Sequence, residues 1–128
     1  MATKKDYIQL INKLTELTQS DTIKWDRRPC PETLIDTNHK IGVVYKTEYK
    51  NQYLRLYEEK YKHYQTIPIS LYESEYYWDD NVILEFIDEK GEHIWQFPYM
   101  RSIWDLLKAV KYNEAKVDNF IESVLFDA

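Results

Sequence analysis

Apolar residues recur at helical spacing near the N-terminus of this chain and form a stripe along one side of a predicted helix. The members of this stripe are Tyr7, Leu10, Ile11, Leu14 and Leu17, spaced three and four residues apart. Asp6 stands three residues after Thr3, which is the pattern of a capping box at the start of a helix. We therefore predict a helix that begins just after Thr3 and ends at the polar residues 18–21.

A second stripe at helical spacing runs toward the C-terminus. Ser102 precedes it and Asp105 stands three residues later, so the same capping pattern predicts a helix that Ser102 caps. Asn113 and Glu114 interrupt the stripe, which predicts two short helices or one kinked helix. The apolar members are Ile103, Leu106, Leu107, Val110, Val117, Phe120, Ile121 and Val124.

Between these two regions the pattern changes to alternation, which is typical of β-strands. The clearest strand is residues 81–88, where Val82, Leu84 and Phe86 face one way. Residues 88–91 predict a hairpin turn that ends in Gly91, and residues 93–97 form the returning strand. Alternation also predicts a short strand at residues 23–25 and, after Pro68, an extended run at residues 69–74. The prolines within residues 26–40 predict a long loop and a candidate binding edge.

Residues 41–64 contain the most regular feature of the sequence, a row of tyrosines spaced four residues apart and followed by Tyr64. The row is Tyr45, Tyr49, Tyr53, Tyr57 and Tyr61. A helix would gather several of these rings on one side, but the alternation of Val, Tyr and Thr with Lys and Glu favours strands. We expect two antiparallel strands joined by a turn at residues 50–52. The tyrosine row would then lie on one face, with most lysines on the other.

Together these elements predict an α+β fold. It consists of an antiparallel β-meander of four to six strands, covered on one face by the N-terminal helix and the C-terminal helical region. A length of 128 residues corresponds to one globular domain, residues 1–128. The other face of the sheet would be rich in tyrosine and open to water or to a partner.

The charge is unevenly distributed along the chain. The formal net charge is −5, because residues 1–65 carry 12 basic against 9 acidic side chains and residues 66–128 carry 5 against 13. A net acidic protein is a poor ligand for phosphate backbones, so we do not expect nucleic acid as a partner. The asymmetry also permits pairing between the two halves, within one molecule or between two copies.

The residues that usually carry chemistry give no catalytic or cofactor signature. Cys30 is the single cysteine, in a Pro-Cys-Pro loop, and the three histidines lie 24 and 30 residues apart, without metal-ligand spacing. Two glycines cannot form a phosphate-binding loop. The acidic stretch 73–92 could supply paired carboxylates, but a solvated loop between strands is the better interpretation. We predict no metal and no cofactor.

These observations favour a small, non-catalytic interaction or regulatory protein of the cytoplasm. The N-terminus has no signal-peptide pattern, and no stretch is long enough to span a membrane. The partner would be another protein or a second copy. The candidate contact residues are the tyrosine row with Arg55, and the acidic aromatic segment that contains Tyr76, Tyr77, Trp78, Asp79 and Asp80. The alternative is a small-molecule or nucleotide binder that uses the tyrosine face and Arg55. A small enzyme that uses Cys30 or the acidic cluster is the third hypothesis.

Overall fold

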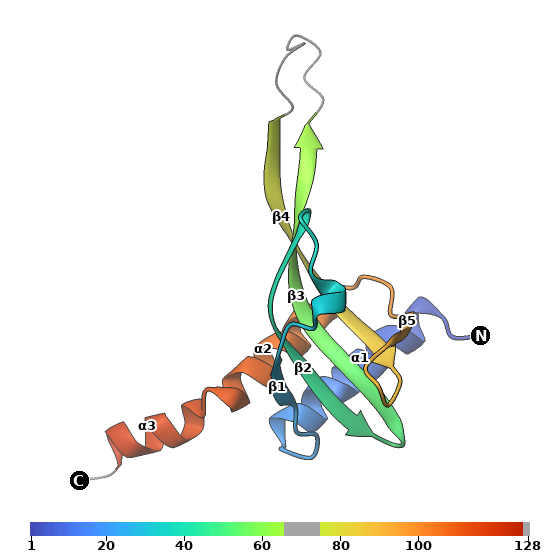
Figure 1. Ribbon diagram of the computed structural model, residues 1–128. Coiled ribbons are helices and arrows are strands. Elements are labelled where there is room, and N and C mark those ends of the chain that lie inside the picture. The colour runs from blue at the N-terminus through green and yellow to red at the C-terminus, as the bar shows by residue number, and fades with distance from the viewer. Residues whose placement is uncertain (66–74, 127–128) are drawn as a thin grey trace.

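The computed structural model describes residues 1–65 and 75–126, and its sheet lies between helices in sequence (Figure 1). In chain order the elements are α1 (Lys4–Gln19), β1 (Asp26–Pro29), the 3-10 helix η1 (Glu32–Leu34), β2 (His39–Tyr49), β3 (Gln52–Gln65), β4 (Glu75–Ile87), β5 (His93–Gln96), α2 (Ser102–Glu114) and α3 (Val117–Leu125). The strands lie in the order β1-β2-β3-β4-β5, each antiparallel to the next. The predicted α+β meander is confirmed.

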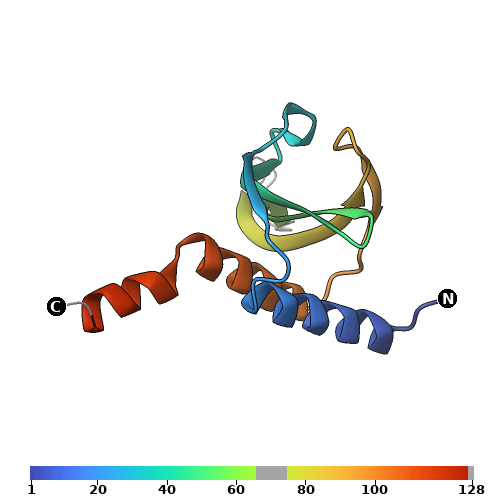
Figure 2. The ribbon, with the colours of Figure 1, turned by 90° about the horizontal axis from the view of Figure 1, so that it is seen from below.

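Helices α1 and α2 pack against each other and against one face of the sheet, as Figure 2 shows. The main core lies between these two layers, because the apolar stripes of the helices meet the apolar side chains of alternate strand positions. Its fully buried members come from both layers: Ile11, Leu14, Tyr45, Leu54, Leu56, Val82, Leu84, Ile103, Leu106 and Leu107. None of the described helices is both long and apolar enough to cross a membrane.

The sheet curls away from these helices, so that its opposite face is concave (Figure 2). The segment that contains η1 and the turn between β4 and β5 both lie on this concave side. A second, smaller core forms there from Val44, Tyr57 and Ile83, with Leu34 of η1 packed against it. The sheet therefore has packed residues on both faces, which the sequence did not indicate.

The predicted capping box of α1 is confirmed. The Asp6 backbone N–H donates to Thr3 Oγ1 at 3.3 Å, and the Thr3 backbone N–H donates to Asp6 Oδ2 at 2.9 Å. The predicted cap of α2 is wrong. Its capping position is Arg101, which has helical backbone angles, and Ser102 is the first residue inside the helix. Backbone bonds from Ile103 to Met100 and from Trp104 to Arg101 close the first turn instead.

Residues 23–25 do not form the predicted strand, although Ile23 is buried as its alternation required. A strand begins immediately afterwards, at β1, and β2 begins at His39, so the prediction of a loop across residues 26–40 is wrong for residues 26–29 and for residues 39 and 40. Pro29 is compatible with β1 because this is an edge strand, where a missing N–H costs no sheet hydrogen bond. All four residues of β1 are exposed, so no alternation of buried and exposed positions marks this strand in the sequence.

The two predicted hairpins are confirmed. Lys50 and Asn51 join β2 to β3 in a two-residue turn with φ of 52° and 64°, the left-handed conformation that such tight turns need. In the β4–β5 turn, Gly91 has φ of 86° and its N–H donates to Asp88 O at 3.0 Å. The paired strands β3 and β4 extend beyond the rest of the sheet as an arm (Figure 1). The predicted extended run at residues 69–74 lies outside the described residues.

The C-terminal region consists of two helices, one of the two predicted arrangements. The break is at Lys116, which has left-handed backbone angles with φ of 54° between α2 and α3. Helix α2 covers the sheet together with α1, while α3 continues past the edge of the body and projects away from it (Figures 1 and 2). The apolar stripe therefore continues in sequence but not in the core, since no residue of α3 is buried.

Candidate interaction surface

The tyrosine row does not lie on one face of the sheet, so that prediction is wrong. Directly opposed residues of an antiparallel pair project from the same face, and Tyr45 is opposed to Leu56 whereas Tyr57 is opposed to Val44. The two-residue turn therefore reverses the parity between the strands. Tyr45 and Tyr49 lie on the helix side, while Tyr53, Tyr57 and Tyr61 lie on the other.

Burial further divides the row. Tyr45 and Tyr57 are buried in the two separate cores, and the other three tyrosines are half-buried. Tyr45 also donates a hydrogen bond to Glu114 Oε2 at 3.1 Å, which connects the end of α2 to the sheet. Burial raises the pKa of both phenols. Most of the contact made by these two rings is internal packing, so the row does not form a continuous exposed platform.

Arg55 lies in the interior, where it forms an ion pair with Glu85. Arg55 is 1% exposed and Glu85 is 3% exposed, and the two residues oppose each other directly on β3 and β4. Arg55 Nε donates to Glu85 Oε1 at 2.5 Å, and a second guanidinium nitrogen contacts the same oxygen. A third nitrogen donates to Gly91 O at 3.0 Å, and His93 Nδ1 lies 2.7 Å from Glu85 Oε2. This cluster attaches the β4–β5 turn to the concave face.

Sequence reasoning missed this pairing, although a signal was present. Arg55 stands between Leu54 and Leu56, and Glu85 stands between Leu84 and Phe86. A charged residue flanked by apolar residues in a strand is ordinarily taken as solvent-facing, because alternation places it on the open face. The curl of the sheet closes that face, and only the register of β3 against β4 shows that the two charges meet.

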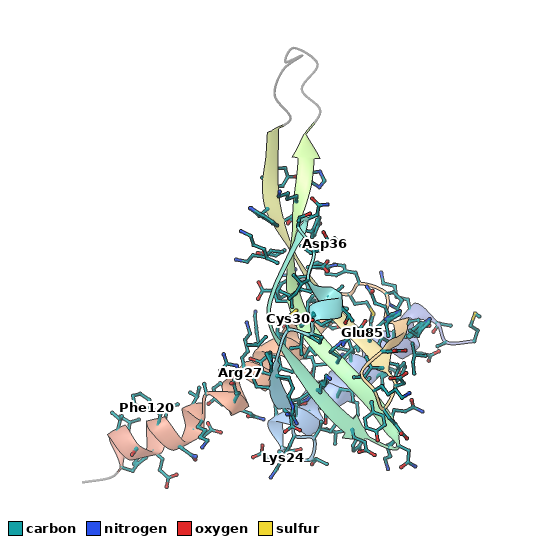
Figure 3. The ribbon with its side chains drawn as sticks, in the orientation of Figure 1. Lys24, Arg27, Cys30, Asp36, Glu85 and Phe120 are labelled. Carbon is teal, nitrogen blue, oxygen red and sulfur yellow. The ribbon has the colours of Figure 1, made fainter. Side chains whose placement is uncertain are left out.

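The surroundings of Cys30 favour its protonated thiol over the thiolate. Its side chain is half-buried, its Sγ lies 3.5 Å from Pro31 O, and Figure 3 places it in the body of the molecule. Burial raises the pKa of the thiol, against the smaller opposing effect of Arg55, so the protonated form is favoured at neutral pH. Across residues 1–65 and 75–126, no three His, Cys, Asp or Glu side chains gather as a metal-binding group.

The acidic aromatic segment lies on the arm and is divided between its two faces. Asp79 is opposed to Tyr61 and accepts a hydrogen bond from its hydroxyl at 3.3 Å, while Tyr77 stacks on His63 with ring centroids 4.9 Å apart. The hydrogen bond and the Asp79 charge contribute to a raised pKa of Tyr61, behind the effect of desolvation. Of the candidate contact residues, Tyr61, Tyr77 and Asp79 therefore lie together on one face of the arm.

The other face of the arm carries Trp78 and Asp80. Lys40 Nζ lies 4.3 Å and Lys62 Nζ 5.6 Å from the Trp78 ring centroid, which are cation–π distances. Tyr76 pairs with Tyr64 through the backbone, and its side chain is outside what the structure describes. The segment is therefore not one aromatic patch rimmed by acid, as the sequence suggested, but two faces of different composition.

An exposed apolar stripe lies on α3, which sequence reasoning did not identify as a contact surface. Phe120 is 68% exposed, and Figure 3 shows it on the projecting helix, away from the body. Ile121, Val124 and Leu125 are also exposed. Together with Phe120 they form one stripe, because Val124 follows Phe120 and Leu125 follows Ile121 at intervals of four residues, and Val124 follows Ile121 at an interval of three. The stripe is visible in the sequence, but the sequence does not show that α3 passes the edge of the sheet.

A second group of exposed apolar residues lies on β5. Ile94 is 60% exposed and Trp95 is 40% exposed. Trp95 is engaged within the molecule, since its ring centroid lies 4.9 Å from that of Phe97 and 6.0 Å from that of Tyr7. Part of the Trp95 ring is therefore packed within the molecule, which distinguishes this group from the α3 stripe.

Comparisons with other proteins gave no match: no protein-family model matches the chain, and no curated protein or solved structure resembles it significantly. The function must therefore be argued from the surface of this chain.

Proposed function

We propose that the protein acts by binding another protein, without catalysis, through the apolar stripe of α3. The observation that carries this proposal is the exposure of Phe120, Ile121, Val124 and Leu125 together on one side of a projecting helix. Contiguous apolar patches of this kind mark contact sites on folded proteins. Burial of one phenylalanine alone removes about 150–250 Å² from water.

The shortness of α3 supports the same proposal. The helix has nine residues and none of them is buried in the single chain. Isolated helices shorter than about 12–15 residues are marginal in water, because packing of an apolar face supplies most helical stability. Within the described chain, α2 is the only element with which α3 makes more than isolated contacts. A binding partner would supply the missing packing.

Contacts at the junction of α2 and α3 also support the proposal, because they fix the orientation of α3 in the free protein. The Tyr112 hydroxyl donates to Asp118 Oδ1 at 2.5 Å, and the Phe120 N–H donates to Lys116 O at 3.1 Å. The hydrogen bond to Asp118 is the main cause of the raised pKa of Tyr112. These bonds orient α3 before any partner arrives, which reduces the entropy lost on binding.

The two other hypotheses have less support. The nucleotide-binding alternative needs exposed tyrosines beside Arg55, but Tyr45, Tyr57 and Arg55 are buried. The enzyme hypothesis needs a reactive Cys30 or converging carboxylates, and the thiol pKa is raised. We also propose a cytoplasmic location, which is supported by a single cysteine that has no cysteine partner in the chain.

A photo-cross-linking experiment tests the proposal. A photoreactive amino acid is placed at Val124, on the stripe, or at Asn119, on the opposite side of the same helix. The chain is expressed in its native cells and irradiated. We expect protein adducts from position 124 and few from position 119. Equal labelling from both positions, or none from either, would contradict the proposal.

A further inference from the structure

A hollow of about 430 Å³ lies between α2 and two strand segments, residues 40–45 of β2 and residues 58–60 of β3. Ile41, Val43 and Leu107 line it with apolar surface, and Lys40, Lys60 and Lys111 stand around it. We call it the lysine hollow. Among its lining residues the only carboxylate is Glu58, which pairs with Lys111 at 3.5 Å. The hollow therefore combines an apolar floor with a positively charged rim.

A β-bulge forms the floor of the lysine hollow. Ile41 is opposed to Glu59 and Val44 to Tyr57, so Gly42 and Val43 together face the single residue between them on β3. A Cβ built on Gly42 meets no atom within 4 Å. The strand thus presents bare backbone and open space at this point, where a side chain from another molecule has room to enter.

The rim of the lysine hollow carries more positive than negative charge. Lys40 is directly opposed to Lys60 on the neighbouring strand, and Asp80 of β4 is opposed to Lys60 on its other side. An acidic ligand would supply further counter-charge at this rim. Helix α3 has such a composition, because it contains Asp118 and Glu122, no basic residue, and an apolar stripe. Its chemistry complements the lysine hollow in both charge and apolar surface.

We propose that the partner of α3 is a second copy of this chain and that α3 docks in the lysine hollow of that copy. This inference rests on the proposed function, since it names the partner of the same apolar stripe. The exchange is reciprocal, because each copy carries one α3 and one lysine hollow. The two contacts are then related by a two-fold axis, the commonest symmetry of protein dimers.

The geometry of the α2–α3 junction favours docking between copies over folding back within one chain. The left-handed Lys116 and the Tyr112–Asp118 hydrogen bond direct α3 away from its own body. To reach its own hollow, α3 would have to break that bond and change the Lys116 conformation. A second copy can meet α3 where it already points.

The groove between α1 and α2 is a poorer acceptor for α3. It is larger, at about 550 Å³, but its charged lining residues are Asp105, Lys108 and Asp118. Two carboxylates against one lysine would repel the acidic helix rather than attract it. Charge therefore distinguishes the two grooves, and it selects the lysine hollow.

Sedimentation equilibrium of the chain tests the inference through matched variants. We expect the wild type to have about twice the chain mass of 15.6 kDa at micromolar concentration, and Phe120→Asp to have the mass of a single chain. Asn119→Asp is the control, because it adds the same charge to the polar side of α3 and should remain dimeric. Gly42→Leu fills the hollow and should also be monomeric.

Mixing variants checks that the contact passes between copies. A Phe120→Asp chain keeps its hollow and a Gly42→Leu chain keeps its α3 stripe, so an equimolar mixture should regain a dimer held by one of the two contacts. Circular dichroism confirms the fold of each variant. Should Gly42→Leu not fold, Lys60→Glu tests the rim instead, with an expected loss of dimer that Glu122→Lys reverses.

The outcomes separate this inference from the proposed function. The wild type could be monomeric at every concentration while position 124 still cross-links to other proteins. That result would overturn the inference that the partner is a second copy, and it would leave the proposed function standing. A monomer without such cross-links overturns both. A dimer that survives Phe120→Asp overturns the role of α3 in self-association. A dimer lost in Phe120→Asp but retained in folded Gly42→Leu overturns the lysine hollow as acceptor.

Discussion

Removal of the Arg55 guanidinium should destabilise the protein more than removal of any exposed charge. Arg55→Met would leave Glu85, which is 3% exposed, without its main counter-charge. Breaking a buried ion pair from one side costs about 3–5 kcal/mol. The remaining His93 contact at 2.7 Å favours the lower end of this range. Loss of the donor to Gly91 O adds about 1 kcal/mol.

The expected total, about 4 kcal/mol, is a large part of the roughly 5–15 kcal/mol that stabilises a domain. The assay is urea unfolding followed by circular dichroism, with the free energy of unfolding obtained by linear extrapolation. Arg27→Met is the matched control, because the Arg27 side chain is 60% exposed and pairs with Glu114 at 3.4 Å. That change should cost less than about 1 kcal/mol.

A double variant tests the cause of the destabilisation. Arg55→Met with Glu85→Leu removes both charges, and we expect it to recover much of the lost stability, since apolar replacements of buried ion pairs are often neutral. If Arg55→Met costs no more than Arg27→Met, or if the double variant is less stable than Arg55→Met alone, the uncompensated carboxylate is not the reason. The buried pair would then be energetically unimportant.

Three further predictions follow from the helices. Thr3→Ala should cost about 1 kcal/mol in urea unfolding through loss of the cap. The pKa of Asp6 is lowered in the folded state by its bonds to Thr3, so the stability from Asp6 is present above its unfolded pKa and is lost as pH falls through the folded one. Thr3→Ala should reduce this acid dependence, and an unchanged pH profile would count against the capping box. Ser102→Ala should be neutral or stabilising, because Ser102 Oγ is buried with no hydrogen-bond partner among the described residues; a cost near 1 kcal/mol would indicate a cap after all. Leu106→Ala should cost about 2–5 kcal/mol as a core truncation, whereas Phe120→Ala measured at a concentration that keeps the chain monomeric should stay within about 0.5 kcal/mol of wild type; comparable losses would contradict the exposed position of α3.

Local signals in the sequence were sufficient for most of the fold. The capping box of Thr3 and Asp6, the two-residue turn at Lys50 and Asn51, and the positive φ of Gly91 each depend on a few neighbouring residues. The alternation of the strands and the helical stripes are also local patterns, so the α+β meander could be predicted. Local reasoning failed at Ser102, where the preceding turn already had helical angles and displaced the expected cap.

The candidate site was less predictable because it depends on long-range geometry. A spacing of four residues fixes the face of a tyrosine only within one strand, and the turn reversed that face between Tyr49 and Tyr53. Burial of Arg55 depended on the curl of the sheet and on Glu85, which lies thirty residues further along the chain. Neither the curl nor the partner has a local signature.

The sequence by itself determined the helices, the two tight turns and the central strands, and that an apolar stripe continues to the end of the chain. Only the tertiary structure decided which stripes are used in the core. Helix α2 packs against the sheet and buries Leu106, while α3 extends past the sheet edge and leaves Phe120 exposed. The physical reason is that amphipathicity specifies one face that must be covered, but the covering surface depends on where the preceding helix ends and in which direction the chain leaves Lys116.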